Sequence, residues 1–397
     1  MIDKEALALR NWQLATEKHL RTHRQNTRGV LLWLAAHLPI SPALTDGRTI
    51  LLIRPDHLGD VLLTGPAIRA LAQAQPGARL VALVGPWSAG VISAFPEIAL
   101  TLTLPFPGFS RHPARTSIQP YLLAVRSALR LRQVRASTAI LFRPDHWWGA
   151  LLVYLAGIPE RVGFDLPDVT PFLSRAISFC PGHAVERNLA LVAPWTGPIN
   201  PHDVQVTFPV EEVDRQDVRE RLAVRGFPDG APRVIIHPGS GTLIKQWSVD
   251  HWARVADRLA AQWGAPIIFT GGDHELLLIQ HITDRMASPA IILAGETTVG
   301  QLAALYAGAK VVLGPDSGPL HLAAAVGTPT VHLYGPADPA EFGPWGDPAR
   351  HAVVTGDIGC RPCRILDWPD DDPACHPCVR DIPPEAVLAA ALRVTSS

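Results

Sequence analysis

The chain has 397 residues, which predicts two domains, and its 47% hydrophobic and 18% charged residues exclude a disordered protein. The formal net charge of -1 excludes an overall field that would attract nucleic acid. No apolar run is long enough to span a bilayer, and the first residues lack the pattern of a cleavable signal peptide, so we expect a cytoplasmic protein. The five cysteines are therefore expected to be reduced or bound to metal rather than paired in disulfides.

Residues 1–45 are expected to form a helical extension. Helical periodicity runs over Glu5–Leu20 and Val30–Leu38, and prolines then end the segment. The apolar residues 31–34 follow three arginines, which would suit a peripheral contact with a membrane surface. We prefer the simpler interpretation that these helices pack on the chain's own domain or on a partner subunit.

Residues 46–205 alternate between strands and helices, which predicts a doubly wound parallel sheet. The strands are short apolar runs without polar alternation, as expected where both faces of a sheet are covered. The predicted strands are Thr49–Arg54, Leu80–Val84, Leu100–Leu104 and Ala139–Phe142. The predicted helices are Val61–Gln75, Ser88–Ala94, Tyr121–Val134 and Trp148–Ala156.

The tetrapeptide Arg-Pro-Asp-His occurs twice in this half, at residues 54–57 after the first strand and at residues 143–146 after a later one. Parallel strands end on the same edge of a sheet, so both tetrapeptides should open onto one site. Asp56, Arg143 and Asp145 are therefore candidates for contacts with an acceptor substrate. A structural turn that happens to recur is the alternative.

Residues 206–355 repeat the alternation after a region rich in proline and glycine, residues 195–232, which surrounds one charged helix at Glu211–Arg225. Two similar α/β halves joined in this way predict a ligand cleft closed by two sheets. The predicted strands are Val234–His237, Pro266–Thr270, Ala290–Leu293, Val311–Leu313 and Thr330–Leu333. The predicted helices are Val249–Trp263, His274–Met286, Val299–Ala307 and Ser317–Val326.

The strand-to-helix turn at residues 314–321 carries several groups that suit an anion. Asp316 and Ser317 stand where a helix N-terminus needs caps, and Gly318 lets a ligand approach the backbone. Free N–H groups and the helix dipole favour a diphosphate, with the imidazole of His321 one turn further on. A capped helix with a buried histidine is the alternative, and we prefer the ligand site because a lysine turn lies upstream.

Two other loops of this half should reach the same site. Ser240, Thr242 and Lys245 follow its first strand, where hydroxyl groups suit a phosphate and the lysine supplies a point charge. The spacing is not that of a Walker loop, and a plain glycine turn with a solvated lysine is the alternative. Asp273 follows the next strand, in a position typical of a carboxylate that binds ribose hydroxyls, with an ordinary helix cap as an equal alternative.

Residues 356–397 form a cysteine-rich tail that ends in a helix at Pro383–Val394. Two C-x-x-C pairs have the spacing of a metal site with four thiolate ligands, namely Cys360, Cys363, Cys375 and Cys378. Such a site has no open position, so a zinc ion, or a single iron, would be structural. Free or disulfide-linked cysteines are the alternative.

The motifs together resemble glycosyltransferase family 9, the ADP-heptose:lipopolysaccharide heptosyltransferases and their relatives. The matching stretches are ILLIRPDHLGDVLLTGPAIRAL at 50–71, IIHPGSGTLIKQWS at 235–248, FTGGDHE at 269–275 and GPDSGPLHLAAAVGTPTVHLYGPADP at 314–339. The resemblance covers residues 48–395 and implies a GT-B fold, in which two Rossmann-like domains face a central cleft. It implies that the N-terminal domain binds the acceptor, that the C-terminal domain binds the nucleotide sugar, and that inverting transfer needs no catalytic metal or other cofactor.

By matching motif, Asp60 looks like the family's general base and Lys245 like its diphosphate-binding lysine, while Asp273 and the turn at 316–321 match its nucleotide side. The resemblance implies transfer of a heptose from ADP-heptose to a cell-surface glycan or a protein. Two alternatives are a sugar-nucleotide epimerase on the same fold, for which Asp60 would be dispensable, and an inactive member that acts as a binding protein. The first 45 residues lie outside the family's pattern, and the four-cysteine tail occurs only in part of the family.

Overall fold

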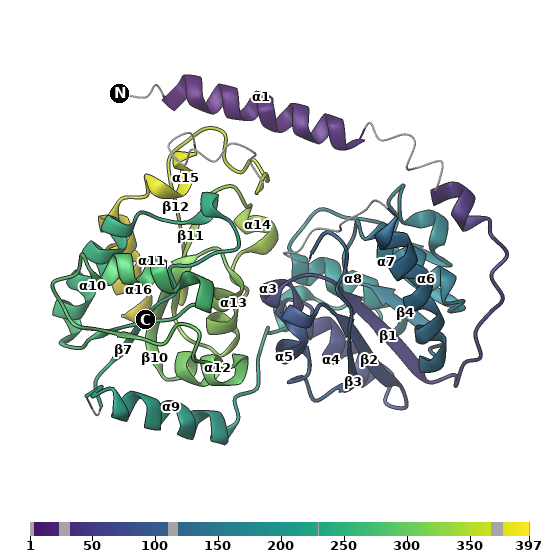
Figure 1. Cartoon of the computed structure of the whole chain (residues 1–397), viewed down its shortest axis with the longest axis horizontal. Coiled ribbons are helices and arrows are strands. Elements are labelled where there is room, and N and C mark those ends of the chain that lie inside the picture. Colours follow the sequence, from purple (N-terminus) through teal and green to yellow (C-terminus); the bar gives the residue numbers. More distant parts are fainter. Residues whose placement is uncertain (1–3, 24–31, 110–117, 229, 367–375, 397) are drawn as a thin grey trace. The chain divides into compact units, whose positions relative to one another are not determined.

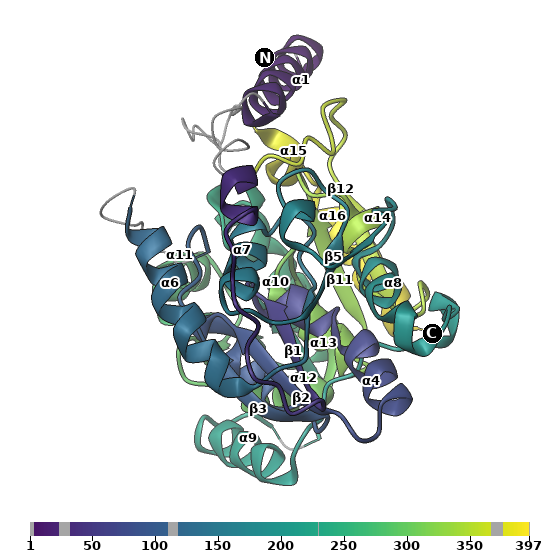
Figure 2. The ribbon, with the colours of Figure 1, turned by 90° about the vertical axis from the view of Figure 1, so that its right-hand side faces the viewer.

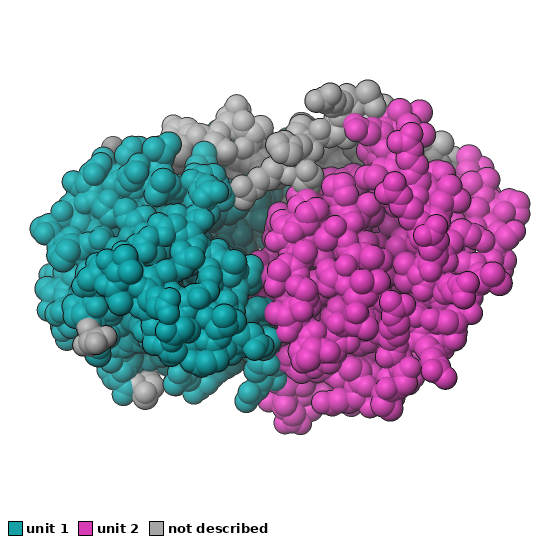
Figure 3. All heavy atoms as spheres, turned by 60° about the horizontal axis from the view of Figure 1, so that its bottom comes forward, with its two compact units in different colours: residues 1–20, 205–397 teal, residues 21–204 magenta. Residues whose placement is uncertain are grey.

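The computed structural model describes residues 4–23, 32–109, 118–228, 230–366 and 376–396 (Figure 1). The chain forms two compact units, of which unit 1 comprises residues 1–20 and 205–397 and unit 2 comprises residues 21–204 (Figure 3). Each unit is built on one six-stranded sheet with helices on its faces. Among the helices of the described ranges, none combines the length and the apolar character that crossing a membrane requires.

The sheet of unit 2 has the strand order β3-β2-β1-β4-β5-β6, and all neighbouring strands are parallel. Its central strand is buried along its whole length, as its uninterrupted apolar sequence predicts. The strands are β1 (Thr49–Arg54), β2 (Arg79–Val84), β3 (Ile98–Thr103), β4 (Thr138–Leu141), β5 (Glu160–Phe164) and β6 (Arg175–Ile177). The helices include α3 (Leu58–Leu62), α4 (Gly65–Ala74), α5 (Ala89–Ile92), α6 (Gln119–Leu131), α7 (Trp147–Leu155) and α8 (Ala184–Thr196).

Helices α6 and α7 cover one face of this sheet, and α4 and α8 cover the other (Figure 2). On the first face, Leu51 and Ile53 of β1 pack in one core with Ala124, Ala128 and Trp148, and each of these five side chains is at most 2% exposed. The small alanines let α6 approach the sheet closely. The packed core fixes the carboxyl ends of β1 and β4, which carry the candidate site of this unit.

The sheet of unit 1 has the strand order β12-β11-β10-β7-β8-β9 and is also parallel throughout. Its strands are β7 (Arg233–Ile236), β8 (Ile267–Phe269), β9 (Ala290–Ile292), β10 (Ala309–Pro315), β11 (Thr330–Tyr334) and β12 (His351–Thr355). Its helices include α9 (Glu212–Val224), α10 (Val249–Trp263), α11 (Leu276–Thr283), α12 (Val299–Ala307), α13 (Gly318–Ala325), α14 (Pro339–Phe342), α15 (Pro377–Arg380) and α16 (Pro384–Thr395).

Helix α1 (Lys4–His23) packs on unit 1, from which unit 2 separates it in the sequence. Residues at four-residue intervals along one side of the helix are buried, namely Leu7, Asn11 and Ala15. Leu7 joins the main core of unit 1, and Ala15 packs with Ile244 and Ile365. The helix predicted over Glu5–Leu20 is therefore confirmed, and its contacts are with the C-terminal half of the chain.

The strands predicted from apolar runs are confirmed, with ends that differ by one or two residues. The single helix predicted over Val61–Gln75 is wrong, because the chain breaks at Leu63–Thr64 into α3 and α4. Pro66, in the first turn of α4, lacks the N–H that a continuous helix would need there. The apolar pattern also misses β5, β6, β12 and α8, of which β6 is short and largely exposed.

Candidate functional site

The two Arg-Pro-Asp-His turns of unit 2 lie side by side, because β1 and β4 are adjacent parallel strands. Asp56 connects them: its carboxylate pairs with Arg54 (Nε to Oδ2, 2.8 Å) and with Arg143. Arg143 also pairs with Asp145, with 2.7 Å between Nε and Oδ1. The expectation that both turns open onto one site therefore agrees with their geometry, while contacts with an acceptor remain a prediction.

Asp56 differs from the other two acceptor-side candidates because it is almost entirely enclosed, with 3% of its side chain exposed. Its backbone carbonyl also accepts hydrogen bonds from Trp87 Nε1 (3.0 Å) and Ser88 Oγ (2.8 Å). Arg143 and Asp145 reach solvent, with 35% and 66% of their side chains exposed. Asp56 thus holds the arginines in place, and the other two side chains are the ones that a ligand can reach.

Asp60 lies in the first turn of α3, a few residues after β1. Its Oδ1 accepts a hydrogen bond from Arg54 Nη2 at 3.2 Å, and 32% of its side chain is exposed. Arg54 is itself fixed, because its Nη1 donates to the carbonyl of Phe142 at 2.6 Å and its Nε pairs with Asp56. Arg54 is not among the residues predicted from the sequence, although a charged residue at the end of a fully buried strand is an informative signal.

Burial and neighbouring charges shift the ionisation of this strand-end cluster. Burial opposes the ionisation of Asp56, but Arg54 and Arg143 outweigh it, so the pKa of the carboxyl is lowered. Burial likewise opposes the charge of Arg143, and two nearby carboxylates outweigh it and raise the pKa of the guanidinium. Burial lowers the pKa of His146 to about 4, so this ring is neutral near pH 7.

In unit 1, the loop after β7 and the turn after β10 converge on one ion pair. Lys245 Nζ lies 2.6 Å from Asp316 Oδ2, with 15% and 9% of the two side chains exposed. His321 Nε2 lies 4.0 Å from the other oxygen of the same carboxylate. The two loops meet because β7 and β10 are adjacent parallel strands. The alternative of a solvated lysine is therefore wrong, and three of the predicted donor-side residues are brought together.

Two hydroxyl groups of this region are buried without a hydrogen-bond partner among the described residues, Ser317 Oγ and Thr242 Oγ1. Ser317 occupies the N-cap position of α13, but its side chain makes no capping bond, so its predicted capping role is wrong. The hydroxyl of Ser240 donates to the carbonyl of Thr242 at 2.7 Å. Buried hydroxyls without partners are unfavourable, and a ligand that bonds them would recover that free energy.

The first turn of α13 offers fewer amide donors than predicted from the sequence. Residue 319 is a proline and has no N–H, and the N–H of Leu320 already donates to the carbonyl of Ser317 at 3.2 Å. Among the described residues, the N–H groups of Ser317 and Gly318 are the donors that remain at this helix end. The start of α13 therefore offers an anion fewer donors than a helix without this proline would.

A buried polar network that is not predicted from the sequence lies beside the loop after β7, which carries Lys245 (the Lys245 loop). His237, which follows β7, has its Nδ1 3.1 Å from Thr270 Oγ1 and its Nε2 3.7 Å from Glu275 Oε2. Thr270 Oγ1 also lies 3.0 Å from the hydroxyl of Tyr306, and Glu275 accepts a hydrogen bond from the N–H of Gly272 at 2.8 Å. The burial of His237 lowers its pKa, so the ring acts here as a neutral hydrogen-bonding group.

Asp273 lies at the start of a short 3-10 turn between β8 and α11, and its side chain is exposed. It lies against Gly295, whose backbone has a φ of 75° and at which a Cβ atom would collide with the carboxylate. The glycine therefore both permits the turn and leaves room for Asp273. Binding of ribose hydroxyls by this carboxylate remains a prediction.

Hydrophobic contacts from distant parts of unit 1 hold the Lys245 loop in position. Ile244, 6% exposed, packs against Ala15 of α1 and Ile365 of the tail. Cys363 packs against the same cluster. The lysine that meets Asp316 is thus attached to a turn that α1 and the cysteine tail both support.

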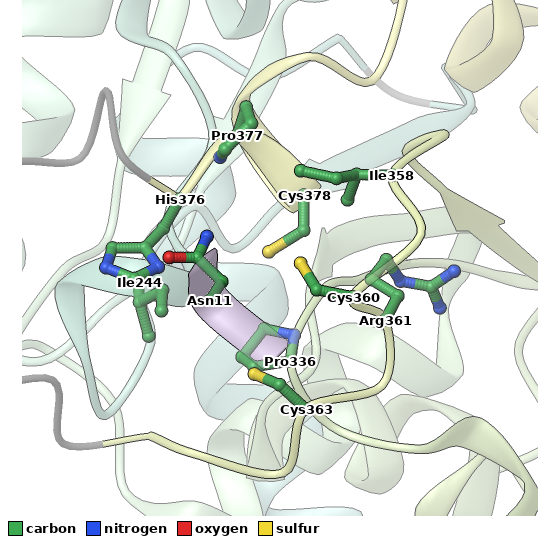
Figure 4. A pocket seen from close by; sticks show the side chains of 10 residues that line it. All are labelled: Asn11, Ile244, Pro336, Ile358, Cys360, Arg361, Cys363, His376, Pro377 and Cys378. Carbon is green, nitrogen blue, oxygen red and sulfur yellow. The ribbon is translucent and has the colours of Figure 1, made fainter. Parts of the chain in front are cut away.

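Three of the four predicted metal ligands, Cys360, Cys363 and Cys378, line one pocket of unit 1 together with Asn11 of α1 (Figure 4). The sulfur atoms of Cys360 and Cys378 are turned toward each other, and the Asn11 side chain hydrogen-bonds Cys360. Burial, together with the neighbouring cysteines, raises the pKa of Cys378 to about 12. The fourth predicted ligand, Cys375, lies outside the described residues.

The described part of the chain holds no group of three His, Cys, Asp or Glu side chains arranged to bind a metal ion. The chemical type of the side chains in the pocket nevertheless suits a metal ion, because three thiols from two C-x-x-C pairs line it. Thiolates select zinc or iron, and a cation would favour their ionisation, which burial opposes. The cysteine site therefore remains a prediction that is consistent with the pocket's chemistry.

Comparisons with known proteins all find similarity to heptosyltransferases. The family model of glycosyltransferase family 9 (heptosyltransferase) matches residues 125–366. Lipopolysaccharide heptosyltransferase 3 of Escherichia coli (strain K12) is 29% identical over 297 residues, which cover 72% of this chain and 82% of the relative.

Solved structures extend the likeness to the fold. The E. coli ADP-heptose lipopolysaccharide heptosyltransferase II superposes with a TM-score of 0.69 at 22% identity, over 88% of this chain and 98% of that one. TibC, an iron-containing dodecameric glycosyltransferase of enterotoxigenic E. coli, gives a TM-score of 0.52 at 14% identity, over 90% and 78%. These likenesses confirm the predicted fold class, GT-B with two Rossmann-like domains.

Proposed function

The chain belongs to glycosyltransferase family 9, and from this membership we propose that it is an inverting heptosyltransferase that uses ADP-heptose in the cytoplasm. Two of the relatives named above are lipopolysaccharide heptosyltransferases, so a glycan of that kind is the proposed acceptor. The observation that carries the proposal is the convergence of Lys245, Asp316 and His321 at adjacent strand ends of unit 1. A buried cation beside unbonded hydroxyls is what a nucleoside diphosphate requires.

The donor would be held through its diphosphate and its ribose. Lys245 would bind the phosphate oxygens, and Ser317 and Thr242 have buried hydroxyl groups that would gain hydrogen bonds from the ligand. Asp273 would accept hydrogen bonds from the ribose hydroxyls. Lys245 would also stabilise the charge that develops on the diphosphate as it leaves, so we expect transfer without a catalytic metal ion.

Asp60 would act as the general base. The oxygen of the acceptor hydroxyl attacks the anomeric carbon of the donor sugar, the carboxylate of Asp60 takes the hydroxyl proton, and the bond from that carbon to the diphosphate breaks to release ADP. The base must be ionised and fixed in direction. The hydrogen bond from Arg54 to Asp60 Oδ1 supports both requirements, because it stabilises the charged carboxylate and restricts its rotation.

A two-part assay tests this proposal. Release of ADP from ADP-heptose is measured with and without a lipopolysaccharide acceptor that lacks its terminal heptose, and donor affinity is measured separately by calorimetry. We expect Asp60→Asn to lose at least a hundredfold in turnover, as removal of a general base does, while donor affinity stays within about twofold. Asp250→Asn on the exposed side of α10 is the matched control and should behave like the wild type.

Other outcomes identify other functions. Conversion of the donor without an acceptor, unaffected by Asp60→Asn, would indicate an epimerase. No binding of ADP, GDP, UDP or ADP-heptose would indicate a binding protein without transferase activity. Equal losses of turnover and donor affinity in Asp60→Asn would refute the assignment of the base.

We also propose that the cysteine tail binds one structural zinc or iron ion through Cys360, Cys363, Cys375 and Cys378. The ion would join the two C-x-x-C pairs and stabilise the tail beneath α1. Elemental analysis of the purified full chain should give about one metal per chain, and Cys360→Ser/Cys363→Ser should lose it. Cys180→Ser, which changes an exposed cysteine outside the tail, is the control and should retain the metal. A folded, metal-free wild-type protein would refute the site.

A further inference from the structure

Helix α6 of unit 2 is apolar on two opposite sides. Its inner side packs on the sheet through Ala124, Ser127, Ala128 and Leu131. Its outer side carries a row of large apolar side chains that are between 42% and 64% exposed, namely Ile118, Tyr121, Leu122, Val125 and Leu129. Their spacing of three or four residues places them along one line of the helix surface. A contiguous apolar row of this kind on a surface indicates a contact with another body.

The charged residues in the stretch of sequence that contains this row are all positive. The sequence from residue 98 to residue 144 contains seven arginines and no aspartate, glutamate or lysine, although the whole chain has a formal net charge of -1. Arg126 and Arg130, on α6 itself, are exposed beside the apolar row. Helix α9 of unit 1 gives a contrast, because its exposed valines stand on a helix that carries both acidic and basic residues.

We propose that this outer face of α6, with Arg126 and Arg130, docks on an anionic phospholipid membrane. A helix lying in the membrane interface places its apolar row among the acyl chains while basic side chains at its edge meet lipid phosphates. Both halves of that pattern are present on α6. The proposed contact differs from residues 31–34, the membrane segment considered from the sequence, and it does not depend on the reaction that the protein catalyses.

The same charges argue against a second copy of the chain as the occupant. A symmetric dimer formed through this face would bring the arginines of one α6 close to those of the other. Like charges at an apolar contact oppose association, whereas an anionic lipid surface attracts each arginine. Charge complementarity therefore favours an anionic membrane over a second copy of the chain as the partner of this face.

The test measures co-sedimentation of the full chain with vesicles of pure phosphatidylcholine and of a phosphatidylcholine–phosphatidylglycerol mixture, at low and at high salt. We expect binding to the anionic vesicles that weakens as salt rises. Arg126→Gln/Arg130→Gln should weaken it by roughly fivefold for each charge, or about 25-fold together. Leu122→Gln/Leu129→Gln should weaken vesicle binding by more than tenfold. The factor by which high salt weakens the binding should be the same in this variant as in the wild type.

The control is Val213→Gln/Val224→Gln on α9, which removes apolar side chains that are at least as exposed and should leave vesicle binding unchanged. All these positions are exposed, so circular dichroism should show folded proteins. Wild-type protein that does not bind anionic vesicles overturns the proposal, as does binding that survives both α6 variants. Self-association without lipid that the α6 variants abolish, with no vesicle binding, also overturns it and assigns the face to a protein contact. Transferase activity is measured in a separate assay, so a lack of membrane binding would not contradict the proposed reaction.

Discussion

Replacing Lys245 by methionine isolates the role of the buried Lys245–Asp316 pair. In the free protein the ammonium and the carboxylate are 2.6 Å apart and both side chains are largely buried. A bound diphosphate would draw on the same lysine. Lys245→Met therefore has two effects, because it removes a ligand of the diphosphate and leaves the negative charge of Asp316 facing it without compensation.

The two effects have separable magnitudes. A hydrogen bond between a charged side chain and a phosphate contributes about 1.5–3 kcal/mol. An uncompensated carboxylate about 8 Å from the phosphates adds about 2 kcal/mol of repulsion at an effective dielectric constant of about 20. Lys245→Met should therefore weaken ADP binding by about 4 kcal/mol, or roughly a thousandfold. Lys245→Met/Asp316→Asn also removes the repulsion and should lose about 2 kcal/mol, or roughly thirtyfold.

Titration calorimetry of the full chain with ADP measures this difference directly. Lys310→Met, which removes a lysine that lies over the ring of Trp263, is the control and should bind ADP like the wild type. The reasoning fails if the single and double variants lose the same affinity, since Asp316 would then not face the diphosphate. Unchanged affinity in Lys245→Met would remove the lysine from the donor site altogether. Thermal unfolding of each variant separates loss of binding from loss of fold.

Three further predictions concern the supports of the two sites. Arg54→Gln should lower turnover at least tenfold and destabilise unit 2 by about 3 kcal/mol, because it removes the hydrogen bond to Asp60 and breaks the buried pair with Asp56. Equal stability of the variant and the wild type in urea unfolding would contradict this prediction. The free energy of unfolding should decrease as the pH is lowered below about 6.5, because His146 then takes up a proton in the unfolded chain but not in the folded protein, where its pKa is about 4. Between pH 7 and pH 5, His146→Phe should lose about 2 kcal/mol less of this free energy than the wild type does. Ala15→Glu should weaken ADP binding several-fold by displacing Ile244, and unchanged affinity would show that α1 does not support the loop.

The sequence predicts the strand framework well because both central strands are buried on both faces. Such strands leave uninterrupted apolar runs, as at Thr49–Arg54, and the residues that follow them must lie at one edge of a parallel sheet. That rule alone predicts the proximity of the two Arg-Pro-Asp-His turns and of the Lys245 loop to the turn at Asp316. Helix ends are predicted less accurately than strands, since one proline divides the helix predicted over Val61–Gln75.

The sequence does not reveal which side chains support the candidate residues. His237 and Glu275 pair across two loops, and Arg54 reaches Asp60 through the geometry of one strand end. These contacts depend on side-chain direction, which periodicity does not encode. Asn11 is a further example, because no local pattern indicates that a residue of the N-terminal helix meets Cys360.

The docking of α1 on the tail sets an order of assembly. Ala15 and Ile365 share one small core, yet the whole of unit 2 lies between them in the sequence. At about 5–20 residues per second, a ribosome needs roughly 20–70 s to synthesise the intervening chain. During that time unit 2 can complete its own core, whereas the Leu7–Asn11–Ala15 face of α1 waits for the surface that will bury it. The turn that carries Lys245 acquires its full support only when this last contact forms, so donor binding should be among the final properties that the nascent protein gains.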